Sequence, residues 1–582
     1  MQAWGGGQRN PGYLLAQFLQ KKSFSAPNRL PNVPHLRLAE TTSSSNSGMF
    51  LTVISFIFFT AFAGFLTWRI TRKDEKSTSD GFFLGGRSLT YPIIAGSLLL
   101  TNLSTEQMVG LNGAAFKHGL SVMAWEVNAV VALVLMAIYF LPKFLQTGIT
   151  TVPQFLELRY NKQTQSIANT IFLFAYALIL IPLILYTGAK GLINMMDLAT
   201  LTGIENSTTL LQLTCILIGI LGLLYSRFGG LRSLAVLDTI NGIGLLIGGI
   251  MIAWFALNAM GGGEGIGAGW TALNENHPEH MDSTGAEGVD VSVPFSTLFT
   301  GVALLNLFYW CTNQQIIQRT FGASSLAEGQ KGVLLTGGLK LLGPLYLVLP
   351  GLVAYHLYSA EGIKPDDAYG TLVARLLPPY LTGFFSAVMV GAILSSFNAA
   401  LNSTSALFSI GLYKHKINPE GTEEQTVKAA KRFVVVIAIA AMVGAPILAS
   451  QETIFTYLQD MNAIYFIPIF SVVLVGLLNR NVPAKAASTA MIAGIILISL
   501  GAFVAPIKQG IKDLGIHNFH YMGIVFALLV TYLLVMAKVS PRSEPWKIET
   551  RNTIDMTPWK GVRWASAASV ILVFVFYAAF AK

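Results

Sequence analysis

Long apolar runs separated by short polar connections recur along the chain from residue 49 onward. A helix needs roughly 20 mostly apolar residues to cross the ~30 Å hydrocarbon core of a bilayer. Runs of this kind lie at 49–70, 91–115, 118–145, 164–190, 206–227, 231–259, 296–317, 329–358, 380–412, 430–450, 453–479, 483–506, 518–538 and 562–581. The pattern predicts an all-α integral membrane protein with about 14 transmembrane helices.

The composition supports a membrane protein. Of the 582 residues, 53% are hydrophobic and only 12% are charged, whereas about 25% of a soluble globular chain is charged. So few charged groups cannot cover a water-facing surface, which disfavours a large soluble protein with an apolar core. Cys215 and Cys311 both fall in apolar runs, which is typical of packed residues and not of a disulfide or metal site.

The distribution of Lys and Arg predicts the orientation of the helices. If the connection at 71–90 is cytoplasmic, the connections on that side carry 25 Lys and Arg and the opposite side carries seven. This asymmetry follows the positive-inside rule. Both ends of the bundle are therefore expected outside, and the net charge of +9 reflects topology, so we expect no nucleic-acid partner.

The first 48 residues form a basic, partly Ser-rich tail, which should resist export across the membrane. We expect residues 1–48 to be a disordered N-terminal extension. The tail is either a targeting segment or an extension upstream of the true start, with Met49 opening the first span, and we favour the second interpretation.

Two spans carry dense polar runs where lipid should be. They are Leu100–Gln107 in the second span and Asn306–Gln315 in the seventh. A single Asn or Ser often joins helices by hydrogen bonds, but two dense runs indicate discontinuous helices, whose unwound carbonyls bind cations at the bilayer midplane. Ionisable residues inside spans usually face a cavity or a partner; they are Glu106, Glu126, Asp238, Lys340 and Asp460.

The spacing of these spans predicts a repeat. The second and seventh spans are five apart, so each opens a five-helix unit, and an odd number of spans gives the two units opposite orientations. We therefore expect an extra N-terminal helix at 49–70, inverted repeats at 91–259 and 296–479, and three C-terminal helices within 483–582.

The ninth span has paired hydroxyls beside small residues, at Gly391–Ser396 and Asn402–Thr404. Neutral hydroxyl and carbonyl oxygens suit a hard monovalent cation. Small residues also serve close helix packing, and this span alone does not separate the two interpretations.

At these residues the chain resembles the sodium/solute symporter family, which has a LeuT-like 5+5 inverted-repeat core. The resemblance runs from about Gly81 to the C-terminus and is strongest to the sugar-transporting branch and its uncharacterised bacterial relatives. The stretches that carry it are Asn102–Gln107, Gly229–Ser233 with Asp238, Asn306–Trp310, Gln314–Thr320, Lys340 with Pro344 and Leu349–Gly351, and Ser395–Ser396 with Leu401–Thr404.

The resemblance implies a sodium site and a sugar site. Sodium would be bound by the carbonyls of Leu100, Leu103 and Ala392 and the hydroxyls of Ser395 and Ser396, with Asp238 near the ion. The sugar would be lined by Asn102, Gln107, Trp125, Glu126, Asn306, Lys340 and Gln459, and Tyr309 would stack on its ring as an aromatic inner gate. The implied protein is a monomeric, multi-pass plasma-membrane transporter, as in a bacterial inner membrane, with Na⁺ as coupling ion and no organic cofactor.

Two departures from the residues of the sugar-transporting branch leave the identity of the solute open. A hydroxyl-bearing position of the sugar branch is Ala129 here, and a tyrosine of that branch is Trp125. Losing a hydroxyl changes discrimination between polyols, so glucose, galactose and inositol remain open, as do non-sugar solutes such as sialic acid. Proton coupling through Asp238 is the rival to sodium. A channel and a transporter-like sensor are more remote, and an enzyme is not expected because zinc-protease, nucleophile-elbow and P-loop motifs are absent.

Overall fold

The computed structural model describes residues 46–72, 84–228, 231–285, 291–450, 454–550 and 554–581. Within these ranges the chain is helical, and its only β pairing consists of two isolated bridges, Leu89–Ala323 and Ser325–Asp555. Most of the tail predicted to be disordered lies outside the described residues. Residues 46–48, which were assigned to that tail, instead begin the first helix, α3 (Asn46–Thr71).

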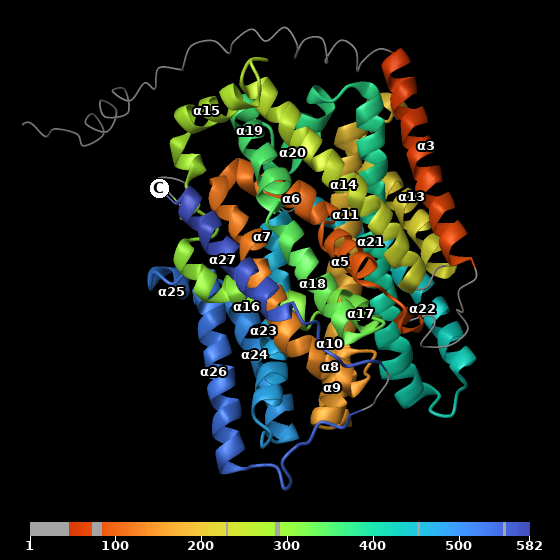
Figure 1. Ribbon diagram of the computed structural model, residues 1–582, viewed down its shortest axis with the longest axis vertical. Helices are drawn as coiled ribbons and strands as arrows, with labels where there is room; N and C mark the ends of the chain where they lie inside the picture. The colour runs from red at the N-terminus through yellow and green to blue at the C-terminus, as the bar shows by residue number, and fades with distance from the viewer. Residues whose placement is uncertain are drawn as a thin grey trace, which may run out of the picture.

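The remaining helices follow the predicted apolar runs (Figure 1). The longer ones and the parts of interrupted ones are α5 (Tyr91–Asn102), α6 (Thr105–His118), α7 (Ala124–Leu135), α8 (Leu141–Thr147), α10 (Lys162–Ala175), α11 (Ile181–Met196), α13 (Ser207–Phe228), α14 (Leu231–Met260), α16 (Gly301–Cys311), α17 (Gln314–Phe321), α18 (Leu326–Lys340), α19 (Leu349–Tyr358), α21 (Pro379–Phe408), α22 (Glu423–Gly444), α23 (Ile454–Leu478), α24 (Ala484–Phe503), α26 (Asn518–Val539) and α27 (Val562–Phe580). Shorter helices in the connections are α9 (Val152–Arg159), α12 (Leu198–Thr202), α15 (Ile266–Asn276), α20 (Pro365–Leu376) and α25 (Ala505–Asp513).

Eleven helical stretches of the described chain are long and apolar enough to cross a membrane, or twelve if the bent pair formed by Leu326–Lys340 and Pro344–Glu361 is one span. The prediction of an all-helical, multi-pass membrane protein is confirmed. The tally of fourteen and the division into two five-helix repeats stay predictions.

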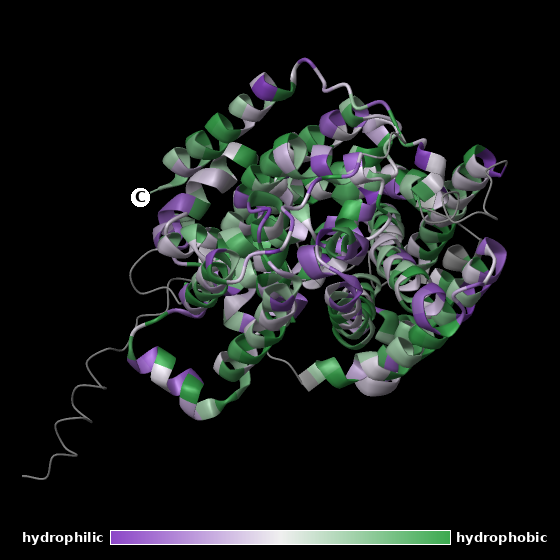
Figure 2. Ribbon diagram, turned by 90° about the horizontal axis from the view of Figure 1, so that it is seen from below, coloured by the Kyte–Doolittle hydropathy of each residue, from purple (hydrophilic) through white to green (hydrophobic). Residues whose placement is uncertain are grey.

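The outer helices present apolar side chains to their surroundings. On α3, Phe50, Phe58 and Trp68 are 68%, 61% and 56% exposed. Figure 2 shows hydrophobic residues on the outermost helices as well as inside the bundle. Exposed apolar surface of this extent is expected where helices contact acyl chains instead of water.

Among the candidate membrane spans of the described chain, the most buried contains α21, in which nearly every residue from Thr382 to Leu407 is buried. It packs against α3, α11 and α14. A helix that is apolar on all sides needs neighbours on all sides, and this places α21 in the interior of the bundle, beside the site described below.

Both predicted interruptions are present. Helix α5 ends at Asn102 and α6 starts at Thr105, with Leu103 at φ −74°, ψ 58° between them. Helix α16 ends at Cys311 and α17 starts at Gln314. A third irregularity, the 46° bend before Pro344, was not predicted, because no polar run accompanies it.

Candidate functional site

The interruption between α5 and α6 removes two carbonyls from helical hydrogen bonding. In a continuous helix, the N–H groups of Ser104 and Gln107 would bond the carbonyls of Leu100 and Leu103. Here Ser104 N–H donates to the Asn102 carbonyl at 2.7 Å, and Gln107 N–H donates to the Ser104 carbonyl at 3.0 Å. The carbonyls of Leu100 and Leu103, the two predicted from the resemblance, are therefore available to a cation.

Helix α21 lies against this interruption. The Ser396 hydroxyl donates to the Thr101 carbonyl at 3.2 Å, and both Ser395 and Ser396 are buried. Ala392, one turn earlier on α21, is also buried. Backbone carbonyls and hydroxyls from α5 and α21 thus occur together, which is the set of neutral oxygens that a sodium ion accepts in broken-helix transporters.

Asp238 of α14 is buried beside the same region. Its carboxylate accepts a hydrogen bond from Ser97 Oγ at 2.8 Å and pairs with Arg319 Nη2 of α17 at 3.3 Å. A buried carboxylate needs such partners. Asp238 is thus linked to both interrupted helices, since Ser97 belongs to α5 and Arg319 to α17.

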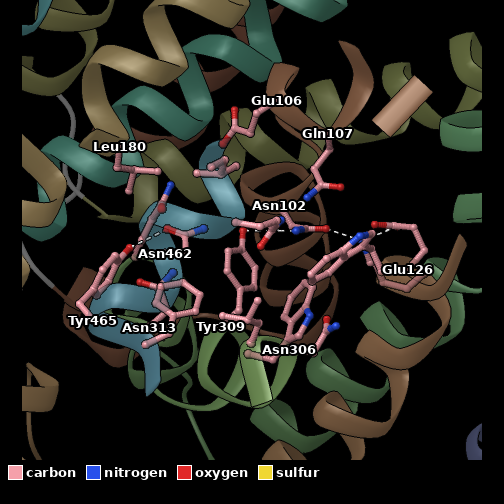
Figure 3. A pocket seen from close by; sticks show the side chains of 18 residues that line it. Asn102, Glu106, Gln107, Glu126, Leu180, Asn306, Tyr309, Asn313, Asn462 and Tyr465 are labelled. Carbon is pink, nitrogen blue, oxygen red and sulfur yellow. Dashed lines mark hydrogen bonds and ion pairs between the residues drawn. The ribbon is translucent and has the colours of Figure 1, made fainter. Parts of the chain in front are cut away.

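The eight residues predicted to line the solute site all border one cavity of about 50 Å³. Figure 3 shows several of them converging from different helices. They are Asn102, Gln107, Trp125, Glu126, Asn306, Tyr309, Lys340 and Gln459. The structure therefore brings the predicted set together, from α5, α6, α7, α16, α18 and α23; their roles in binding stay a prediction.

A polar network crosses the cavity. Asn102 Nδ2 donates to the Tyr309 hydroxyl at 3.2 Å, and Asn102 Oδ1 accepts from the Lys340 ammonium. Lys340 forms an ion pair with Glu126, and both side chains are 1% exposed. The charges of Lys340 and Glu126 balance each other, and the amide, hydroxyl and charged groups offer both donors and acceptors to a polyhydroxylated solute.

Aromatic side chains cover one side of the cavity. The Trp125 ring lies edge-on to Phe455 and Phe519, with centroids 5.7 and 5.5 Å apart. Beyond them, on the side that the distribution of Lys and Arg predicts to face outward, is a second cavity of about 500 Å³ that shares Trp125 and Gln459 with the first; we call it the outer vestibule. We call Trp125, Phe455 and Phe519 the aromatic layer.

Hydrogen bonds link residues on the opposite side of the cavity. The Tyr176 hydroxyl donates to Asn313 and accepts from the Gln315 N–H at 3.0 Å.

Solute sites usually have a volume of roughly 300–1,000 Å³, so a cavity of about 50 Å³ must widen before a sugar can enter. The geometry is that of a closed site.

Ten further residues line the cavity without having been predicted as solute residues: Glu106, Leu180, Leu305, Trp310, Asn313, Gln315, Leu458, Asn462, Tyr465 and Phe466. Glu106 was expected only to face a cavity or a partner. Some had a usable pattern. Asn313 and Gln315 belong to the polar run of the seventh span, and Asn462 follows Gln459 by three residues, which places both on one helix face. Tyr465 and Phe466 carry no such pattern.

Comparisons with known proteins agree with this geometry. The sequence profile of the sodium:solute symporter family matches residues 82–494. The chain is 42% identical over 534 residues, 91% of each chain, to "Uncharacterized symporter YidK" of Escherichia coli (strain K12). It is 31% identical over 476 residues to the sodium/glucose cotransporter of Vibrio parahaemolyticus, covering 78% of this chain and 84% of that protein.

Among solved structures, a Na⁺-coupled sialic acid symporter in a substrate-bound outward-open state matches with a TM-score of 0.70. The match covers 85% of this chain and 99% of the symporter, at 18% sequence identity. At this identity the match concerns the fold alone, and it confirms the predicted fold class.

Proposed function

Because the chain belongs to the sodium:solute symporter family and is a multi-pass membrane protein, we propose that it carries a sugar into the cell together with sodium. The observation that carries this proposal is the convergence of all eight expected solute residues on one cavity, next to the freed carbonyls of Leu100 and Leu103. The similarity to a sodium/glucose cotransporter supports a sugar over other solutes.

The network of the cavity suits a sugar. Asn102, Asn306 and Gln459 each offer a donor and an acceptor to hydroxyl groups. The Tyr309 ring, fixed by its hydrogen bond to Asn102, provides an apolar surface for the ring of the solute. Lys340 and Glu126 add charged hydrogen-bond partners, which are stronger than neutral ones.

Sodium couples to the solute through α5. In our proposal, the ion is bound by the carbonyls of Leu100, Leu103 and Ala392 and by the hydroxyls of Ser395 and Ser396. Asn102, a solute residue, lies between the two sodium-binding carbonyls of the α5–α6 interruption. A sodium ion that fixes this segment therefore also orients Asn102, so ion and solute stabilise the same conformation.

The ion gradient supplies enough energy for accumulation. Moving one charge inward is worth about 2.3 kcal/mol per 100 mV, and a tenfold sodium gradient adds about 1.4 kcal/mol. One ion per solute therefore supports accumulation of a few hundredfold.

The test is uptake of labelled glucose, galactose and inositol into proteoliposomes with and without an inward sodium gradient. We expect at least one solute to accumulate only with the gradient, and Ser395→Ala and Ser396→Ala to abolish that accumulation. Ser386→Ala, on the same helix and equally buried, is the matched control. Normal sodium-driven uptake by both variants would contradict the sodium site, and uptake driven by a pH gradient in sodium-free buffer would favour proton coupling through Asp238.

A further inference from the structure

Gln315 is the second residue of α17 and follows the second helix interruption. Its side chain is 3% exposed and lines the cavity that the eight expected solute residues border, here called the central cavity. Two of those eight, Asn306 and Tyr309, lie on α16, before the interruption. Gln315 is not one of the eight, and it reaches the central cavity from the other side of the interruption.

The backbone of Gln315 is held by a residue of another element. In a continuous helix its N–H would donate to the carbonyl of Cys311, but the interruption separates the two residues. The N–H donates instead to the Tyr176 hydroxyl at 3.0 Å, and this hydroxyl donates to Asn313. Tyr176 directly follows α10 and is buried. The start of α17 is therefore fixed from outside its own helix.

The side-chain amide of Gln315 connects α17 to α21. Its Nε2 donates to the backbone carbonyl of Ser396 at 3.3 Å. This bond identifies the two ends of the amide, because a carbonyl can only accept a hydrogen bond. Ser396 is one of the expected sodium ligands, and its side chain is buried. Gln315 therefore contacts the helix that carries expected ion ligands and also lines the cavity expected to bind the solute.

Ser396 extends this connection to the first helix interruption. Its hydroxyl donates to the Thr101 carbonyl at 3.2 Å, and Thr101 directly precedes Asn102. Because the hydroxyl uses its proton for this bond, its lone pairs are left for a cation. Hydrogen bonds thus lead from Gln315 through Ser396 to Thr101, and they join the two interruptions across the proposed sodium site.

The second polar atom of the amide, Gln315 Oε1, accepts no hydrogen bond from the residues that the structure describes. Buried polar side-chain atoms usually have a partner. A buried glutamine often serves only to join helices, but here that role uses Nε2 alone. Because Gln315 lines the central cavity, its Oε1 is available to a hydroxyl group of the solute.

We propose that Gln315 couples the two ligands: its Oε1 accepts a hydrogen bond from a hydroxyl of the sugar, while its Nε2 holds α21 at Ser396. This inference rests on the proposed function and adds a second connection between ion and solute, beside Asn102 of α5. The amide is planar, so a partner at one end orients the other. A sodium ion that positions Ser396 therefore prepares Oε1 for the sugar, and the bound sugar in turn favours the ion-binding position of α21.

The experiment measures equilibrium binding of labelled glucose, galactose and inositol to the purified protein, in sodium chloride and in choline chloride of equal ionic strength. The ratio of the two dissociation constants is the coupling factor. For a sugar that binds, we expect a coupling factor of about 5 to 150 in the wild type, the usual range for linked sites. Gln315→Met keeps the length of the side chain and removes both hydrogen bonds, so it should lower the coupling factor about fivefold.

Gln315→Asn is a second, more conservative variant. It keeps the amide but is one methylene shorter, so it should no longer reach the Ser396 carbonyl, and the coupling factor should again fall about fivefold. A residue that only stabilises the fold would weaken sugar binding equally in both salts and leave the coupling factor unchanged. If Gln315→Met does not fold, Gln315→Asn decides the question alone.

The matched control is Gln212→Met on α13. Gln212 Nε2 donates to the Met442 carbonyl of α22 at 2.9 Å, so this glutamine also joins two packed helices by one hydrogen bond. It does not line the central cavity. The control variant should keep the coupling factor of the wild type.

The outcomes separate this inference from the proposed function. A lower coupling factor in the Gln315 variants but not in Gln212→Met supports the inference. If the wild type binds a sugar more tightly in sodium and the Gln315 variants keep its coupling factor, the inference is overturned and the proposed function stands. An equal fall in Gln212→Met also overturns the inference. If sodium tightens the binding of no sugar in the wild type, the proposed function and this inference are both overturned.

Discussion

At the scale of single residues, the ion pair between Lys340 and Glu126 dominates the central cavity. Both side chains are 1% exposed, and Lys340 also donates to Asn102 and lies 5.6 Å from the centre of the Trp310 ring. Burying two charges is costly unless each satisfies the other. The pair therefore fixes the polar network and makes it sensitive to the loss of either partner.

Removing one partner should destabilise the protein more than removing both. We expect Lys340→Met to lower the free energy of unfolding by about 3 kcal/mol, because it leaves Glu126 buried without its cation. The double variant Lys340→Met/Glu126→Gln should recover part of this loss, since no buried charge is left. Thermal unfolding of the purified proteins in detergent checks this, and additive losses in the double variant would show that the two residues act independently.

Gly343 leaves the space that Glu126 occupies. A Cβ at Gly343 would lie 2.5 Å from Glu126 Oε2 and 3.0 Å from its Cγ. Gly343→Ala should therefore displace Glu126 and raise the KM for the solute about tenfold, by analogy with the loss of a charged hydrogen bond worth roughly 1.5 kcal/mol. Gly338→Ala on α18, where a Cβ would meet no atom within 4 Å, is the control and should transport normally. Equal KM values for the two variants would rule out this packing role.

The sequence predicts some residues of the central cavity and not others. Asn102, Gln107 and Lys340 stand at motif positions that the resemblance specifies. Tyr465 and Phe466 reach the cavity only through the rotation of α23, which depends on packing against α16 and α24. The partnership of Arg319 with Asp238 has a similar cause, since residues 81 positions apart meet only after α14 and α17 have packed.

At the scale of elements, α14 and α21 approach closely where the predicted sodium ligands lie. A Cβ at Gly391 would lie 2.4–2.7 Å from the side-chain amide of Asn241. Gly391 immediately precedes Ala392, and Asn241 is three residues after Asp238. The glycine thus sets the distance between a proposed sodium carbonyl and the nearby carboxylate.

Gly391→Ala should push α21 away from α14 and weaken sodium binding. We expect the sodium concentration for half-maximal uptake to rise about tenfold, because small displacements of coordinating groups cost this much or more. Gly444→Ala, at the end of α22 where a Cβ would meet no atom within 4 Å, is the control. An unchanged sodium dependence in Gly391→Ala would contradict the placement of the ion between these helices.

Helix interruptions were predictable where a run of polar residues interrupts an apolar span. The polar segments Leu100–Gln107 and Asn306–Gln315 predicted both helix interruptions, since a lipid-facing helix does not tolerate such runs. The bend before Pro344 and the short helix α15 were missed. The bend was missed because a proline after a glycine also occurs in continuous spans. Helix α15 was missed because its sequence contains several glycine and polar residues, and its helix depends on packing against α14.

At the scale of the whole molecule, a buried carboxylate links two distant parts of the bundle. Asp366 of α20 accepts a hydrogen bond from the N–H of Ile454, the first residue of α23, at 3.4 Å. Burial is the largest effect on this group and raises its pKa to about 6 from a usual value of 3.8. The folded protein therefore binds this proton more tightly than the unfolded chain does.

Asp366 should consequently make the protein less stable as pH rises from about 4 to about 6. The loss is at most about 3 kcal/mol, as a shift of one pKa unit corresponds to 1.36 kcal/mol. Asp366→Asn should remove this part of the pH dependence and raise the melting temperature near pH 7. Melting curves between pH 4 and 7 test this, with Asp513→Asn, an exposed site, as control; an unchanged pH slope in Asp366→Asn would be the contrary result.

The broad architecture could be predicted from one whole-chain property, the length of the apolar runs. This property reflects the bilayer as solvent and does not depend on side-chain packing. The orientation predicted from the distribution of Lys and Arg stays a prediction. The closed state of the central cavity does depend on packing, because it requires Trp125 of α7 to meet Phe455 of α23 and Phe519 of α26. No pattern along the chain specifies these contacts.

If one site couples a sodium ion to the solute, the solute should stimulate the influx of radioactive sodium into proteoliposomes, and this influx can be measured directly. We expect a transported sugar to increase sodium influx in the wild type, with a constant ratio of ions to solute, and to have no effect in Ser395→Ala/Ser396→Ala. Entry of the sugar without any accompanying sodium influx in the wild type would contradict the account.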